Sequence, residues 1–352
     1  LLAAVLTLTL AMLGGLIRLD REKPVKPNWF PAVIQGDISQ RRNANTNQAQ
    51  EALEIYLQLS RDALAGKPKP EILLWPESAV PVPYRSTHSV SFLFRIGLQN
   101  LILQSGVPML IGAIDFEDKL PGSATPPGMT NSALFFNHRG RLRRKYDKIH
   151  RVPYGEYIPF RRCLPGFIVR MIDMNRDLVP GADYNPIEVR SDVRAGTAIC
   201  YEGVFGYLTR EFARRGANVL VVLSNDAWYP KSSEPEQHLA NATLRAVETG
   251  LPMVRCGNNG GSLVVTPYGR ITQVLTVDGP EQRPELRRGR GVKTLAVGVE
   301  PNPAYTFYVR HSEWFIAVLA AVEAVFWLAA FAGFKKRKQA LLDAIRRPGA
   351  GS

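Results

Sequence analysis

Between about residues 28 and 310, short apolar runs alternate with longer segments of helical periodicity, and this alternation restricts the fold more than any other feature. Apolar residues return at intervals of three and four over 45–65, 90–105, 203–215 and 235–250, which predicts four helices. Alternating strands and helices are typical of an α/β domain whose sheets are covered by helices. We therefore predict one such domain over residues 28–310. The predicted strands lie in PAVIQG, EILLWPE, PMLIGAID, SALFFN, RLRRKYDK, TAICYE, NVLVVLSND, PMVRCGN, GSLVVTP and TLAVGVE, and the hairpin turns in NHRGR and TPYGR.

Both ends of the chain are apolar. Residues 1–17 carry no charge, which predicts the end of a transmembrane helix whose earlier part lies upstream; a signal-peptide core is the alternative, but it lacks a basic start and a small-residue cleavage site. Residues 314–334 are long enough to cross a bilayer, with Glu323 as the one charge. They are followed by KKRK at the start of a basic tail, 335–352. By the positive-inside rule this tail is cytoplasmic, so the α/β domain is predicted to lie outside the cytoplasm, although the basic residues after the first apolar run favour the opposite orientation.

The formal net charge is +13, yet the basic residues are scattered and form no basic helix face or aromatic-interleaved patch. This distribution argues against a nucleic-acid partner and favours a domain that rests on anionic lipid headgroups. The three cysteines, Cys163, Cys200 and Cys256, are widely spaced, so they leave room for one disulfide and at least one free thiol. The five histidines are isolated from one another and from cysteine pairs, and no metal site is predicted.

Three predicted strands end in residues that carry chemistry. Glu77 follows EILLWP, Lys148 follows RLRRKYD, and Cys200 follows TAI. A cysteine by itself is more often buried for packing than reactive. However, a thiol must lose its proton to become a nucleophile, and a nearby carboxylate can accept that proton. A lysine and a backbone N–H, here that of Tyr201, can stabilise the oxyanion formed when a thiolate attacks a carbonyl.

Six segments in this order carry a resemblance to a known family. LLWPESAVP, KIHRVPYGEYIP, AICYE, LSNDAWY, QHLANATLRAVETGLPMVRCGNNG and TPYGRI resemble the apolipoprotein N-acyltransferases of the nitrilase, or carbon–nitrogen hydrolase, superfamily. The resemblance extends from VIQGDISQ at 33–40 to the final apolar segment. It implies a four-layer α-β-β-α nitrilase-like sandwich with flanking transmembrane helices, in the bacterial inner membrane as a multi-pass protein whose catalytic domain faces the periplasm.

The resemblance also implies roles for individual residues. The family's nucleophile falls on Cys200, its general base on Glu77 and its oxyanion lysine on Lys148. Supporting positions fall on Glu156, Tyr201 and Glu202. The implied reaction moves a fatty acyl chain from a phospholipid, through a cysteine thioester, to the N-terminal amine of the S-diacylglyceryl-cysteine of an apolipoprotein, and it needs no cofactor.

Each supporting residue also has a purely structural interpretation. Glu156 is explained as well by pairing with Lys148, Tyr201 by its backbone alone, and Glu202 by the favourable position of a carboxylate at a helix N-terminus. Asn131 and Trp228 are the candidates for a substrate pocket. The structural interpretation of Asn131 is a turn at the start of a strand, and that of Trp228 is a core residue or a lipid-facing wall. His238 is interpreted as a helix-face residue that packs under the site.

Two other functions remain open from the sequence. A membrane-anchored amidase of the nitrilase family would hydrolyse a small amide, with water as the acceptor. A catalytically silent, nitrilase-like interaction module is the third reading, and the intact set of Glu77, Lys148 and Cys200 argues against it.

Overall fold

The computed structural model describes residues 2–20, 22–39, 46–118, 126–167, 177–228, 232–277 and 288–346. The chain divides into two compact units, residues 1–306 and 307–352. The strands of the first unit are β1 (Pro31–Gln35), β2 (Ile72–Trp75), β3 (Met109–Phe116), β4 (Met129–Phe136), β5 (Leu142–Asp147), β6 (Ile187–Arg190), β7 (Val193–Ile199), β8 (Val219–Ser224), β9 (Met253–Gly257), β10 (Leu263–Val265), β11 (Ile271–Val274) and β12 (Gly291–Thr294). Its helices are α1 (Leu2–Asp20), α2 (Thr46–Ala65), α3 (Ser89–Ser105), α5 (Gly206–Arg214) and α6 (Glu234–Thr249).

These strands form two six-stranded sheets, in the orders β12-β1-β2-β3-β4-β5 and β11-β10-β9-β8-β7-β6. Three parallel strands lie at the centre of each sheet, β1-β2-β3 and β7-β8-β9, and antiparallel strands flank them. Every residue of β2 and of β8 is buried, as expected for strands covered on both faces. The predicted α/β architecture is therefore confirmed for this unit.

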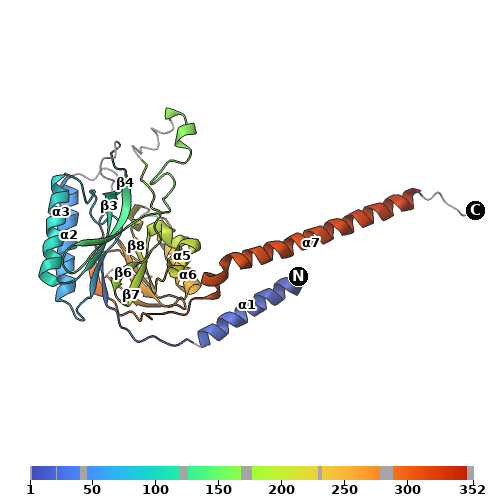
Figure 1. The fold of residues 1–352 in the computed structure, drawn as a ribbon, viewed down its shortest axis with the longest axis horizontal. Helices are drawn as coiled ribbons and strands as arrows, with labels where there is room; N and C mark the ends of the chain where they lie inside the picture. Colours follow the sequence, from blue (N-terminus) through green and yellow to red (C-terminus); the bar gives the residue numbers. More distant parts are fainter. Residues whose placement is uncertain are drawn as a thin grey trace, which may run out of the picture. The chain divides into compact units, whose positions relative to one another are not determined.

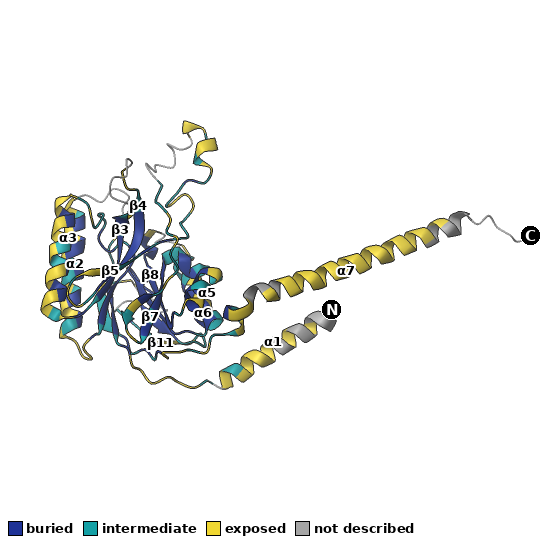
Figure 2. Cartoon of the chain, viewed as in Figure 1, coloured by how far each residue is buried: buried dark blue, intermediate teal, exposed yellow. Residues whose placement is uncertain are grey.

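Helices cover the outer face of each sheet (Figure 1): α2 and α3 lie on the first sheet, and α5 and α6 lie on the second. The inner faces of the two sheets meet in the core, where the strands are buried and the outer helices expose one face to solvent (Figure 2). The buried thiol of Cys256 in β9 lies at this junction and donates to the carbonyl of Leu74 in β2 at 3.3 Å. The order of layers is α-β-β-α.

The four helices predicted within this unit are present, with one shifted start. The apolar face of α3, which includes Phe94, Leu98 and Ile102, is buried, and the helix ends at Gly106 in the left-handed conformation that suits glycine. The predicted helix over 203–215 begins later, because residues Cys200–Val204 form a 3₁₀ turn and α5 starts only at Gly206.

The strand prediction is accurate in the core and weaker at the sheet edges. NHRGR and TPYGR form the predicted hairpin turns between β4 and β5 and between β10 and β11. TLAVGVE is not the predicted strand: Val297 makes an isolated bridge to Trp29, and the edge strand β12 ends at Thr294. The edge strands β6, β11 and β12 are short, and their alternation is too brief to stand out in the sequence.

Helix α1 includes residues 2–17 of the predicted first apolar segment, and residue 1 lies outside the described residues. Near its end, Arg18 donates to the carbonyls of Val247 in α6 at 3.1 Å and of Pro267 at 3.2 Å, and its guanidinium lies over the Tyr268 ring. A long polar side chain thus fixes the end of α1 against the C-terminal end of α6.

The second unit begins with helix α7 (Phe307–Arg346), which has non-helical backbone angles at His311. Within the described part of the chain, Ala317–Gln339 is the one stretch long and apolar enough to cross a membrane, with a mean hydropathy of 2.0. The helix continues through the basic segment to Arg346, so the first part of the predicted tail is helical, and residues 347–352 lie outside the described residues. The predicted domain boundaries and the multi-pass arrangement stay predictions.

Candidate active site

The first sheet contributes a buried cluster of one lysine, two carboxylates and an amide. Lys148 Nζ lies 3.2 Å from Glu77 Oε1 and 2.9 Å from Glu156 Oε1. The amide Nδ2 of Asn131 donates to the same two oxygens, at 2.7 and 2.8 Å. Glu77 and Lys148 follow β2 and β5, which run in the same direction, and Asn131 lies at the start of the antiparallel β4. One edge of the sheet therefore brings Glu77 together with residues that lie 54 to 79 positions further along the chain.

This cluster leaves two groups available for chemistry. A lysine ammonium has three N–H donors, and the two carboxylates accept two of them. Among the described residues, the buried Oε2 of Glu77 has no hydrogen-bond partner. The third N–H of Lys148 can therefore donate to a developing oxyanion, and Glu77 Oε2 can accept a proton.

The lysine is held in its charged form. Burial by itself lowers the pKa of Lys148, but the nearby Glu77 and Glu156 carboxylates outweigh it and raise the pKa well above its usual value. Lys148 is accordingly an electrostatic donor in this arrangement and does not act as a base.

Cys200 comes from the second sheet, directly after β7. Its backbone φ is +51°, in the left-handed region that non-glycine residues rarely adopt, and Ser78 next to Glu77 has a φ of +49°. Strain of this kind costs about 1–3 kcal/mol and concentrates at functional sites. The abrupt change from strand to 3₁₀ turn places the thiol at the end of the strand, where Cys200 is partly exposed.

Glu202 ties the cysteine turn to the lysine segment. The carboxylate is fully buried and accepts four hydrogen bonds: from the N–H groups of Ile149 (2.7 Å), His150 (2.9 Å) and Ile199 (2.9 Å), and from the Tyr146 hydroxyl (2.9 Å). Burial nevertheless raises the pKa of Glu202 to about 7, against the effect of these donors and of Lys148. Glu202 thus fixes the relative position of the two predicted catalytic segments.

A second polar cluster lies near Cys200. A ring nitrogen of His238 and a carboxylate oxygen of Asp226 lie within 4.8 Å of the Cys200 sulfur, and His238 Nδ1 lies 2.6 Å from Glu234 Oε1 and 3.4 Å from Asp226 Oδ1. Asp226 Oδ2 in turn lies 2.6 Å from Nη2 of the fully buried Arg255. The sequence interpretation of His238 as a packing residue missed this contact, and it missed Asp226 and Arg255 altogether.

Opposing effects act on the thiol. Desolvation raises the pKa of Cys200 most, and the Glu77 carboxylate adds to the rise, whereas the nearby His238 ring and the charge of Lys148 lower it. Charged groups of both clusters therefore act on the pKa of the Cys200 thiol.

The predicted supporting residues have unequal places in this site. Asn131 is buried and hydrogen-bonded to the two glutamates, so it belongs to the polar cluster, and its place in a substrate pocket stays a prediction. Glu156 also accepts from the backbone N–H of Val152 at 2.8 Å, which holds the turn after Lys148. The ring of Tyr201 packs edge-on against Phe205 at 5.0 Å. Trp228 is 46% exposed and is not a core residue.

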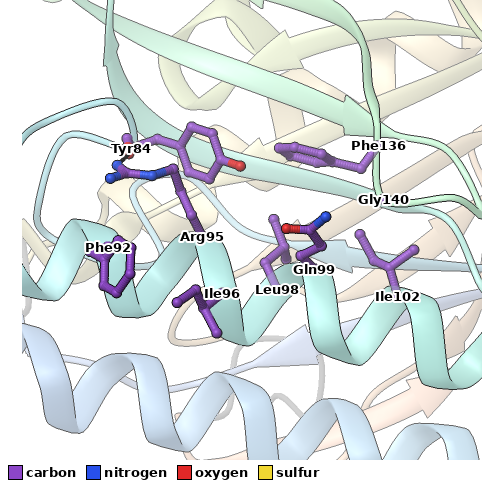
Figure 3. Close-up of a pocket in the computed structure, with 9 residues that line it drawn as sticks. All are labelled: Tyr84, Phe92, Arg95, Ile96, Leu98, Gln99, Ile102, Phe136 and Gly140. Carbon is purple, nitrogen blue, oxygen red and sulfur yellow. Dashed lines mark hydrogen bonds between the residues drawn. The ribbon is translucent and has the colours of Figure 1, made fainter.

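Two surface cavities lie away from this chemistry. One, of about 280 Å³, lies between α3 and the β4–β5 turn and is lined by Arg95, Gln99 and Phe136 among others (Figure 3). The other, of about 380 Å³, is lined by Trp29, Glu71 and Arg190 among others. Neither cavity contains a predicted site residue.

Cys200, Asp226 and His238 offer atoms within 4.8 Å of one another, a spacing that suits a metal ion. The donor set fits a cation poorly, since Arg255 already neutralises Asp226, and the Asp226 and Glu234 carboxylates hold His238 in its protonated form. The three cysteines are all free, so the disulfide for which the sequence left room does not form.

Comparison with known proteins places this geometry in a family. The sequence profile of the carbon-nitrogen hydrolases matches residues 32–281, most of the α/β unit. The chain belongs to the carbon–nitrogen hydrolase family. A variant of the Nesterenkonia AN1 amidase, a nitrilase-superfamily structure, shares the fold with a TM-score of 0.52, at 19% identity over 78% of this chain and 92% of that one.

Curated relatives within this family carry a more specific name. The apolipoprotein N-acyltransferase of Brucella suis biovar 1 is 34% identical over 294 residues, covering 82% of this chain and 50% of the relative. That of Geobacter metallireducens is 33% identical over 240 residues, 68% of this chain and 44% of the relative. The chain thus spans about half the length of the curated relatives it matches.

Proposed function

We propose that this chain carries the catalytic part of an apolipoprotein N-acyltransferase. In this proposal Cys200 takes a fatty acyl chain from a phospholipid and passes it to the N-terminal amine of an S-diacylglyceryl-cysteine. The curated relatives support this choice of reaction. The observation that carries it is the buried Oε2 of Glu77, which has no hydrogen-bond partner among the residues that the structure describes, beside Lys148, whose ammonium donates to two carboxylates there; Glu77 and Lys148 both act electrostatically on the Cys200 thiol.

The first half-reaction forms the thioester. Glu77 Oε2 accepts the thiol proton, and Sγ of Cys200 attacks the ester carbonyl carbon of the phospholipid. The resulting oxyanion is stabilised by the third N–H of Lys148 and by the backbone N–H of Tyr201. When the C–O bond breaks, the lysophospholipid alkoxide takes the proton back from Glu77, so charge and protons balance.

The second half-reaction releases the acyl chain. The acceptor amine attacks the thioester carbonyl, Glu77 takes one amine proton, and Glu77 returns this proton to the sulfur of Cys200 as the C–S bond breaks. The products are an amide on the acceptor and the free enzyme. In this scheme Asn131 and Glu156 orient Glu77 and Lys148 and do not exchange protons.

The setting fits a lipid substrate. Helix α7 contains a stretch long and apolar enough to cross a membrane. In the proposal the enzyme is a multi-pass protein of the bacterial inner membrane, with its α/β domain in the periplasm. The basic residues from 335 onward would then lie on the cytoplasmic side, consistent with the positive-inside rule.

The transfer reaction itself tests this function. The chain, reconstituted in phosphatidylethanolamine vesicles, is incubated with a synthetic peptide that begins with S-diacylglyceryl-cysteine, and the peptide mass is followed. We expect the mass to rise by one fatty acyl group, and this increase to be lost in Cys200→Ala and in Glu77→Gln. Release of ammonia from short amides with no gain in peptide mass would overturn the proposal in favour of an amidase.

A further inference from the structure

Two polar clusters act on Cys200, one from the first sheet and one from residues of β9, α6 and the segment after β8. The cluster of Glu77, Lys148 and Glu156 accounts for proton acceptance and oxyanion stabilisation in the proposed reaction. The second cluster, formed by His238, Asp226, Glu234 and Arg255, has no part in that scheme. Yet a ring nitrogen of His238 and a carboxylate oxygen of Asp226 lie within 4.8 Å of the reactive sulfur.

The second cluster is built to keep the His238 ring charged and in one place. Two carboxylates face Nδ1, Glu234 at 2.6 Å and Asp226 at 3.4 Å, and they favour the imidazolium form. Asp226 is itself fixed by Arg255 and accepts from the Ser224 hydroxyl at 2.8 Å. These groups come from the end of β8, from β9 and from α6.

Arg255 shows how rigid this support is. Its guanidinium donates to the carbonyls of Gly260 (3.2 Å) and Gly261 (3.0 Å) and to the Ser224 hydroxyl (2.9 Å), besides the pair with Asp226. A Cβ at Gly261 would lie 1.9 Å from Nη1 of Arg255, and the φ of Gly261 is +68°, so only glycine fits there. A fully buried arginine with these partners holds Asp226 in one position against His238.

We propose that His238 is a further catalytic residue, an imidazolium beside the Cys200 sulfur that stabilises its thiolate electrostatically. Asp226 and Glu234 keep the ring charged, and Arg255 keeps Asp226 in place. The inference rests on the proposed function only in taking Cys200 as the nucleophile. Without this cation, Glu77 alone would have to remove the thiol proton of Cys200, although desolvation disfavours the thiolate.

The charges around the two groups support this division of roles. Glu77, Lys148 and Asp226 act on Cys200, and Asp226 and Glu234 act on His238. Burial lowers the pKa of His238, but the nearby Asp226, Cys200 and Glu234 raise it to about 12. The ring is therefore charged throughout the neutral range, and it lowers the pKa of the thiol while Glu77 raises it.

The alkylation rate of Cys200 tests the proposal without any lipid substrate. The full chain in detergent is treated with iodoacetamide between pH 7 and pH 11, and alkylation of each cysteine is followed by peptide mass spectrometry. His238→Gln is expected to move the midpoint for Cys200 upward by about one pH unit or more. At pH 8 the rate is expected to fall about threefold or more, because tenfold less thiolate is only partly offset by its higher nucleophilicity.

The chain offers internal controls. Exposed Cys163 reports the intrinsic reaction and buried Cys256 reports unfolding, so a folded variant changes neither. His138→Gln, in the exposed β4–β5 turn, is the matched substitution and should leave the Cys200 profile unchanged. Glu234→Gln keeps the ring and should shift the midpoint in the same direction by a smaller amount.

The outcomes separate this inference from the proposed function. An unchanged Cys200 midpoint in a folded His238→Gln or Glu234→Gln variant would overturn the role of His238. A shifted midpoint in a protein that forms no acyl thioester would support the role of His238 and count against the acyltransferase reaction.

Discussion

Gly112 in β3 is predicted to be essential for the position of Glu77. A Cβ at Gly112 would lie 2.4 Å from the carbonyl oxygen of Pro76 and 2.5 Å from the Cα of Glu77. An ordinary contact needs about 3.4 Å or more, so Gly112→Ala requires the backbone at Glu77 to move by about 1 Å. Overpacking of this kind costs about 1–3 kcal/mol, and a 1 Å displacement of a catalytic group costs about 100-fold in rate.

The assay is single-turnover formation of the Cys200 thioester in phosphatidylethanolamine vesicles, with urea unfolding measured in parallel. Gly203→Ala is the matched control, since its Cβ would meet nothing nearer than the 3.5 Å contact with Val222, although Gly203 lies in the same turn as Cys200. We expect Gly112→Ala to lose about 100-fold in rate and Gly203→Ala to change little. Equal rates in Gly112→Ala and the unmodified chain would refute the reasoning, as would equal losses in both variants.

Three other substitutions test separate parts of the site. Asn131→Ala removes two hydrogen bonds to carboxylates, one of them to Glu77, each worth about 1.5–3 kcal/mol of stability. The melting temperature should fall, and thioester formation in the folded variant should fall by tenfold or more; an unchanged rate would contradict this. Arg255→Met removes the guanidinium that pairs with the buried Asp226 Oδ2 and should lower the free energy of unfolding by about 3–5 kcal/mol in urea titrations, whereas a neutral result would mean the pair is dispensable. The pKa of Glu202 is raised to about 7, so the folded state keeps a proton that the unfolded state loses above pH about 4.3. The stabilisation by this proton is full below pH about 4.3 and is lost as the pH rises through 7. Glu202→Gln should remove this pH dependence, on the order of 3 kcal/mol, from unfolding free energies measured between pH 5 and pH 8, and an unaltered pH dependence would count against it.

The sequence predicts the sheets well where strands are buried on both faces. Runs such as ILLW and VLVVL are apolar at every position, so they are best buried on both faces of a sheet. Gly106 and Gly250 mark helix ends, because their backbone is left-handed. The edge strands are harder, because β12 has no fully buried residue and pairs with β1 more than 250 positions away. Such pairing depends on tertiary contacts that leave no local pattern.

In the candidate site, too, the sequence predicts residues that have a local pattern and misses those that depend on tertiary contacts. Glu77, Lys148 and Cys200 were found because each follows a recognisable strand and because the flanking segments resemble one family. The left-handed conformation of Cys200 leaves no trace in the residue type. His238 was interpreted as a packing residue, since one histidine on a helix face gives no hint of Asp226, which follows a different strand.

The central claim is that Cys200 carries the acyl group, and intact-mass measurement tests it most directly. The purified chain is incubated with phosphatidylethanolamine vesicles and weighed before and after neutral hydroxylamine, alongside Cys200→Ser. We expect an increase of one fatty acyl group that hydroxylamine removes and that the variant lacks. An increase that persists in Cys200→Ser, or no increase in a folded, vesicle-bound protein, would contradict the account.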